Sequence, residues 1–88
     1  MAEQLQFERR GERRWFADLD GGAFYRIEEF PGGTRSDFDL QFIERVADRW
    51  SNKGWSLRYE KVSTHRSLER AIERANRHYH DRATLAEA

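Results

Sequence analysis

Apolar residues recur at every second position on both sides of the turn signal Asp20-Gly21-Gly22. They are Trp15, Ala17 and Leu19 before the turn, and Ala23, Tyr25 and Ile27 after it. A three-residue loop sets Leu19 opposite Ala23 and continues that pairing along both runs, so that all six side chains share one face of a hairpin. We therefore predict strands at residues 13–19 and 23–30, with Gly22 in the left-handed region of backbone space.

The residues before this hairpin predict one more strand, at 5–10. Gly11-Glu12 follows it and fits a two-residue hairpin turn, with glycine at a position that needs a positive φ. The chain is thus expected to open with three antiparallel strands joined by short turns.

The segment 38–52 fits two different periods. Its first apolar residues, Phe38, Leu40 and Phe42, alternate as in a strand. Five apolar residues also lie within a single helical arc of about 140°; they are Phe42, Ile43, Val46, Ala47 and Trp50. Signals for a helix start and a helix end flank the segment: Ser36 fits an N-cap with Asp37 and Asp39 in the first turn, and Asn52-Lys53-Gly54 fits a C-terminal stop. These signals favour a helix over 38–52, and a strand remains the alternative.

The last third of the chain predicts a strand followed by a helix. Residues 55–62 alternate Trp55, Leu57 and Tyr59 with polar side chains, as a half-buried strand does. Residues 67–79 carry one narrow apolar stripe at helical spacing, made of Leu68, Ala71, Ile72, Ala75 and Tyr79. Residues 83–88 have little to bury, and we expect a frayed tail there.

These elements predict a single α+β domain over residues 1–82. The order is β-β-β-α-β-α, with a small antiparallel sheet and helices packed on one of its faces. If 38–52 is a strand, the fold becomes a β-meander with one C-terminal helix.

Composition narrows the class of protein. The 88 residues contain no cysteine, 36% are charged and 14% are aromatic, as expected of a small folded domain without disulfides. The sequence shows neither a signal-peptide pattern nor an apolar run of about 20 residues, so we expect a soluble, cytoplasmic protein and no membrane partner.

Charge is divided between the two halves of the chain, although the formal net charge is zero. Residues 18–48 hold eight acids and three bases, a balance of −5, whereas residues 49–82 hold nine bases and four acids, a balance of +5. Each half could therefore steer toward a different partner.

One face of the predicted hairpin carries aromatic residues for which the core has no evident room. Phe16, Phe24, Arg26 and Phe30 lie on the side opposite the six core residues and form our candidate partner-binding set. Exposed aromatics beside arginine are typical of protein interfaces.

Arginine supplies 14 of the 16 basic residues and gathers at two places. Arg9, Arg10, Arg13 and Arg14 surround the first turn, and Arg66, Arg70, Arg74 and Arg77 follow one side of the last helix. Both groups are candidate contacts to phosphate or to an acidic partner. The competing explanations are edge-strand charge and an ordinary solvated helix face.

No pattern indicates catalysis, a cofactor or a metal. The paired carboxylates have turn or cap explanations or point to opposite faces of a strand, and no serine or threonine lies in a nucleophile motif. His78 and His80 are two residues apart on the predicted helix and point in different directions. We therefore expect a non-enzymatic protein without a cofactor or a bound metal.

The leading hypothesis is a small protein–protein interaction module, an inhibitor or adaptor that acts by occlusion, and a second copy in a homodimer is one candidate partner. Its size and lack of catalytic signatures are typical of accessory proteins such as those encoded by phages or mobile elements. The alternative is a nucleic-acid-binding protein that uses the arginine-rich hairpin and the last helix. Nucleic acid is the less favoured partner, because the net charge of the chain is zero and most nucleic-acid-binding domains are basic.

Overall fold

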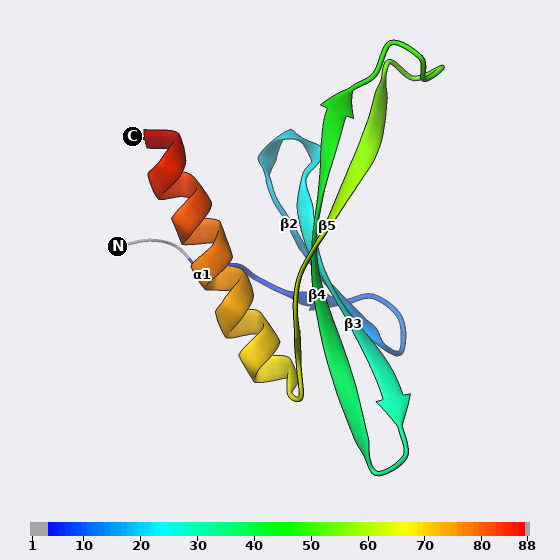
Figure 1. Ribbon diagram of the computed structural model, residues 1–88, viewed down its shortest axis with the longest axis vertical. Helices are drawn as coiled ribbons and strands as arrows, with labels where there is room; N and C mark the ends of the chain where they lie inside the picture. Colours follow the sequence, from blue (N-terminus) through cyan, green and yellow to red (C-terminus); the bar gives the residue numbers. More distant parts are fainter. Residues whose placement is uncertain (1–3, 88) are drawn as a thin grey trace.

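The computed structural model describes residues 4–87 and contains a five-stranded antiparallel meander followed by one helix (Figure 1). The strands are β1 (Glu8–Arg9), β2 (Arg14–Asp18), β3 (Phe24–Gly32), β4 (Arg35–Ala47) and β5 (Trp55–His65), and they lie side by side in that order. The helix is α1 (Leu68–Glu87). The meander with one C-terminal helix is therefore confirmed, and the order β-β-β-α-β-α is wrong.

The register predicted for β2 and β3 is confirmed. Trp15 pairs with Ile27 and Ala17 with Tyr25. The Leu19 N–H donates to the Ala23 carbonyl at 2.9 Å, which closes a three-residue 3₁₀ turn at Asp20–Gly22. Gly22 has the predicted positive φ, at +84°.

The turn between β1 and β2 is one residue longer than predicted. The Arg10 N–H donates to the Arg14 carbonyl at 2.9 Å, so the loop contains Arg13 as well as Gly11 and Glu12. Gly11 has a φ of +106°, as the turn chemistry requires. β1 is limited to Glu8 and Arg9, at the edge of the sheet, and is shorter than the predicted strand at 5–10.

The predicted helix over 38–52 is wrong, because β4 runs as a strand through most of that segment and pairs along its length with both β3 and β5. Phe42 and Ile43 are consecutive and both buried, on opposite faces of the sheet. A strand buried on both faces has adjacent apolar residues, and that pattern imitates helical spacing. Ser36, Asp37 and Asp39 consequently lie inside β4 and cap no helix.

The β4–β5 hairpin also replaces the predicted helix end. Asn52, Lys53 and Gly54 belong to its turn, where the Asp48 N–H donates to the Gly54 carbonyl at 3.0 Å. Trp50, which the helical pattern assigned to the core, lies in the same turn and is 87% exposed.

α1 lies against one face of the sheet (Figure 1) and closes the main core. Two alanines, Ala71 and Ala75, are fully buried against Tyr25, Ile27 and Leu40. Small side chains at these positions let the helix approach the sheet closely. The predicted stripe is confirmed, since its other members, Leu68, Ile72 and Tyr79, pack against the same core.

Two details of the C-terminal half differ from the sequence prediction. α1 is helical through residues 83–87, where we expected a frayed tail. In β5, Val62 is an extra residue at a bulge, because Leu40 pairs with Ser63 while Gln41 pairs with Lys61. Before the bulge, Trp55, Leu57 and Tyr59 alternate onto the face opposite α1, whereas Val62 packs with the core beneath the helix.

Candidate functional site

The face of the sheet opposite α1, called here the open face, is covered by no element among residues 4–87. The predicted Phe16, Phe24 and Arg26 meet on it. Phe16 pairs with Arg26 across β2 and β3, and the Phe16 and Phe24 rings lie 5.9 Å apart between centroids. These three side chains therefore form one contiguous group in the centre of the sheet.

Arg26 is held over this group by neighbours on β4 and β5. Its Nε donates to Oε1 of Gln41 at 2.9 Å, and its Nη2 contacts the same oxygen. Its guanidinium also lies 5.8 Å from the centroid of the Tyr59 ring. Cation–π contact and a fixed hydrogen bond both pre-order the arginine, which lowers the entropy that a partner must overcome.

The centre of the open face includes three residues that sequence reasoning did not select. Tyr59 and Leu57 on β5 are 58% and 37% exposed, and Ile43 lies beneath them, fully buried. The register sets Phe24, Ile43 and Tyr59 in one row across β3, β4 and β5. The alternation in β5 did predict which of its sides is apolar. Because residues 38–52 were predicted as a helix, the sequence did not show that this side faces away from α1.

Phe30, the fourth predicted residue, lies apart from this group. It sits near the end of β3, paired with Asp37, and is 48% exposed. Glu28 stands between it and Arg26 on the same face of β3. Phe30 therefore extends the open face toward the β3–β4 turn and does not belong to its aromatic centre.

Three acidic groups on the open face have partners within the molecule. Arg10 contacts Asp18 at 2.6 Å, and this hydrogen bond lowers the pKa of the carboxyl below its ordinary value. Arg14 contacts Glu28 at 3.0 Å. The Thr64 hydroxyl donates to Asp39 at 2.8 Å. Internal pairing removes most of the repulsion that these carboxylates would offer to an acidic partner.

The predicted arginine hairpin is mostly occupied by contacts of its own. Arg9 donates to the Glu12 carbonyl at 2.7 Å and to the Gly11 carbonyl at 3.1 Å, so it fastens its own turn. Arg10 and Arg14 make the ion pairs above. Of the four, only Arg13 has no ion pair or side-chain hydrogen bond to a described residue. These contacts favour the structural explanation over a phosphate site.

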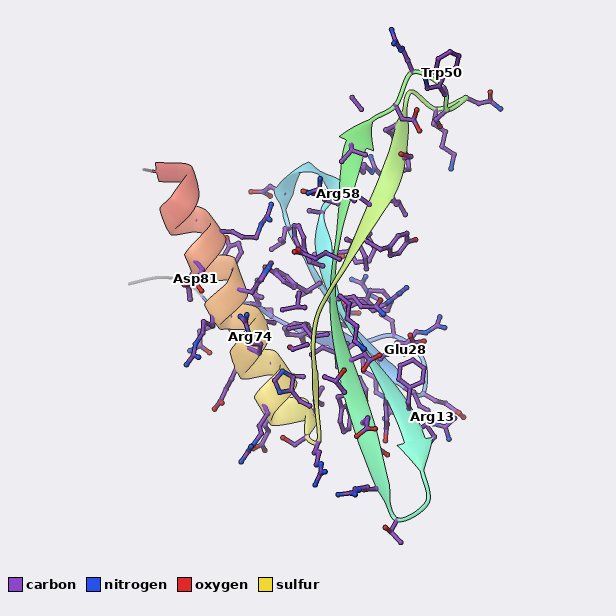
Figure 2. The ribbon with its side chains drawn as sticks, in the orientation of Figure 1. Arg13, Glu28, Trp50, Arg58, Arg74 and Asp81 are labelled. Atoms are coloured by element: carbon purple, nitrogen blue, oxygen red, sulfur yellow. The ribbon has the colours of Figure 1, made fainter. Side chains whose placement is uncertain are left out.

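The second predicted arginine group has a different environment, with Arg66 just before α1 and the other three members on it. Arg70, Arg74 and Arg77 line a shallow hollow together with His65, Ser67, Glu69 and Glu73. Arg66 lines an adjoining hollow with Asp37 and Thr64. None of the four arginines has an ion pair within 4 Å among described residues, and Nη1 of Arg74 is buried without a partner there. Figure 2 labels Arg74 on α1, away from the open face.

His78 fills the space between α1 and the covered face of the sheet. Its Nδ1 lies 2.7 Å from the Tyr25 hydroxyl, and its Nε2 lies 3.7 Å from Glu60 on β5. Burial lowers the pKa of His78 and raises the pKa of Tyr25 to about 12. Glu60 opposes the shift at His78, and Arg82 and Arg74 add to it. Both groups are therefore expected to be neutral in the folded protein at neutral pH.

This arrangement predicts a pH dependence of stability. Because the pKa of His78 is lowered on folding, the unfolded chain binds its proton first as pH falls through 6.5. The free energy of unfolding should therefore decrease below that pH. His78→Gln should flatten the decrease in urea titrations that span the region, and His80→Gln should retain it. Equal pH profiles for wild type and His78→Gln would refute this role.

Neither a metal site nor a membrane-spanning helix is found within residues 4–87. No three His, Asp or Glu side chains gather there in a way that could hold an ion. α1 is the longest helix in that range, and it is too polar to cross a bilayer.

Comparison of the chain with known protein families, with curated proteins and with solved structures found no match.

Proposed function

We propose that the protein is a non-enzymatic binding module that recognises another protein through the open face, and that it acts as an inhibitor or adaptor by occlusion. The observation that carries this proposal is the asymmetry of the sheet. One face is covered by α1, while the other carries the exposed Leu57 and Tyr59 together with the half-buried Phe16, Phe24 and Arg26.

The composition of this group supports a protein partner. Tyrosine, phenylalanine and arginine are enriched at interface centres, where few residues supply most of the affinity. Phe24 and Tyr59 flank the fully buried Ile43, so both rings are supported by a packed side chain. Arg26 is already ordered by Gln41 and Tyr59. A partner therefore meets an arrangement that needs little reorganisation.

The charges around the group support an uncharged or acidic contact surface on the partner. Asp18, Glu28 and Asp39 are engaged within the open face. Arg26 keeps its positive charge beside the rings, with the neutral Gln41 as its hydrogen-bond partner. An acidic group on the partner would meet a pre-positioned guanidinium, to which it can bind through two parallel hydrogen bonds.

The absence of cysteine from the chain makes a site-specific test straightforward. Lys61→Cys places a unique thiol on the open face beside the aromatic group, two residues from Tyr59 on the same side of β5, and Asp81→Cys places one on an exposed position of α1 (Figure 2). Each variant is labelled with a thiol-reactive photo-crosslinker and irradiated in a native lysate. We expect discrete adducts from Lys61→Cys and not from Asp81→Cys.

Adduct mass identifies the class of partner. An adduct of twice the chain's mass would mean that a second copy occupies the open face, in a homodimer. Adducts that form only from Asp81→Cys, or equally from both positions, would place the contact elsewhere and refute the proposal.

A further inference from the structure

The tip of the β4–β5 hairpin presents a single exposed tryptophan. Trp50 is 87% exposed, the largest exposure among the large apolar side chains described. Figure 2 shows it at the far end of the hairpin, away from the helix and from the centre of the sheet. This ring is not packed in the core of the protein, although tryptophan has the largest apolar surface of any side chain.

The turn that carries Trp50 is ordered by its own hydrogen bonds. The Trp50 N–H donates to Oδ1 of Asp48 at 3.0 Å, and the Ser51 N–H donates to the Asp48 carbonyl at 3.1 Å. The Gly54 N–H donates to the Ser51 carbonyl at 3.1 Å, and Gly54 supplies the positive φ, +83°, that returns the chain to β5. The ring is thus presented from a defined backbone.

One basic side chain lies near the Trp50 ring, and two more lie near the ring of Trp55, where β5 begins. Residues 45–55 contain three bases and one acid, and the acid, Asp48, caps the turn. Arg49 lies 5.7 Å from the Trp50 ring centroid. Arg45 and Lys53 lie 4.2 Å and 5.0 Å from the centroid of the neighbouring Trp55 ring. The tip therefore combines a free aromatic face with a local positive charge.

We propose that this tip binds single-stranded nucleic acid, with the Trp50 ring stacked on an unpaired base and Arg49 and Lys53 in contact with the flanking phosphates. The site is separate from the open face and does not depend on the function proposed for it.

The chemistry of the tip favours this ligand over two others. Insertion into a membrane needs a wide apolar surface, and Trp50 is the only large apolar residue between Asp48 and Gly54. A protein hot spot lies in a packed surface whose surrounding contacts exclude water, whereas Trp50 stands almost fully exposed among Ser51, Asn52 and Lys53.

Binding is tested with a short fluorescein-labelled oligo(dT), followed by fluorescence anisotropy at low salt. Trp50→Ala should weaken binding by between about 5-fold and about 150-fold, the range found when a stacking aromatic is removed. The exposure of Trp50 means that this change should leave the thermal unfolding curve unaltered.

Salt dependence tests the phosphate contacts. Neutralisation of two phosphates by Arg49 and Lys53 gives a slope of log K against log salt of about −1.4, and Lys53→Gln should reduce its size by about 0.7. Arg35→Gln, at the start of β4 beside the β3–β4 turn, is the matched charge control and should bind as wild type. Phe24→Ser is the aromatic control and should also bind as wild type, which separates this site from the open face.

Several results would overturn the proposal. The first is that the wild-type chain does not bind oligo(dT). The second is that Trp50→Ala binds oligo(dT) as tightly as wild type does. The third is that Arg70→Gln loses as much affinity as Trp50→Ala, which would place the contact on α1. A Trp50 fluorescence change with anionic lipid vesicles but not with oligo(dT) would assign the tip to a membrane surface instead.

Discussion

Phe42→Ala is expected to lower the free energy of unfolding by about 3–5 kcal/mol. Phe42 lies on β4, the strand that pairs with both β3 and β5, and it is almost completely buried. Its ring contacts Tyr25 at 5.0 Å and His78 at 5.7 Å between centroids, and the Arg82 guanidinium lies 4.4 Å from it. The substitution therefore opens a cavity where the sheet and α1 meet.

Such a loss is a large fraction of the stability of a domain this small, which is typically about 5–15 kcal/mol. Urea unfolding followed by circular dichroism measures it. Phe30→Ala is the matched control, because the same atoms are removed from a side chain that is 48% exposed at the end of β3. We expect its cost to be below about 1 kcal/mol. Similar costs for the two variants would mean that Phe42 is not in the core.

The parts of the fold that were predictable from sequence are those in which one face is buried and the other is not. Ala17 and Tyr25 fall on the covered face because alternation in β2 and β3 is regular and the turn length fixes the register. The stripe of α1 was readable for the same reason, since Ala71 and Ala75 recur at helical spacing among charged residues.

The prediction failed at β4 because both of its faces are buried. Phe42 and Ile43 are neighbours with nearly equal burial, so the strand period disappears in the middle of the segment. Trp50 then completed an apparent helical arc, although it lies in a turn. Only the pairing of β4 with two distant strands decides between the two structures, and a pattern within 15 residues does not contain that information.

The candidate site was predictable in part. Phe16, Phe24 and Arg26 do lie together on the face opposite the core. Tyr59 and Leu57 were missed, because their place on that face follows from the β4–β5 register. The partners of the arginines were equally hidden. Arg10 reaches Asp18 across a hairpin whose loop length was predicted one residue short, and such a pair depends on register.

Phe24→Ser has the second large expected effect, a loss of partner affinity of about 30-fold or more, the value that defines a hot spot. Phe24 packs against Phe16 with its ring tilted and borders Ile43 in the centre of the open face. Serine removes the ring from both contacts and from the surface that a partner would bury. Tyr59→Ser should act in the same direction, and its larger exposure makes it less dependent on the stability of the fold.

The most direct test of partner binding at the open face is the recovery of proteins from a native lysate by the immobilised chain. Recovery is compared among wild type, Phe24→Ser, Tyr59→Ser and Trp50→Ser, each shown by circular dichroism to be folded. The open-face account predicts at least one protein that wild type and Trp50→Ser retain and that both open-face variants lose. If every protein captured by wild type is retained equally by Phe24→Ser and Tyr59→Ser, the open face is not the binding surface.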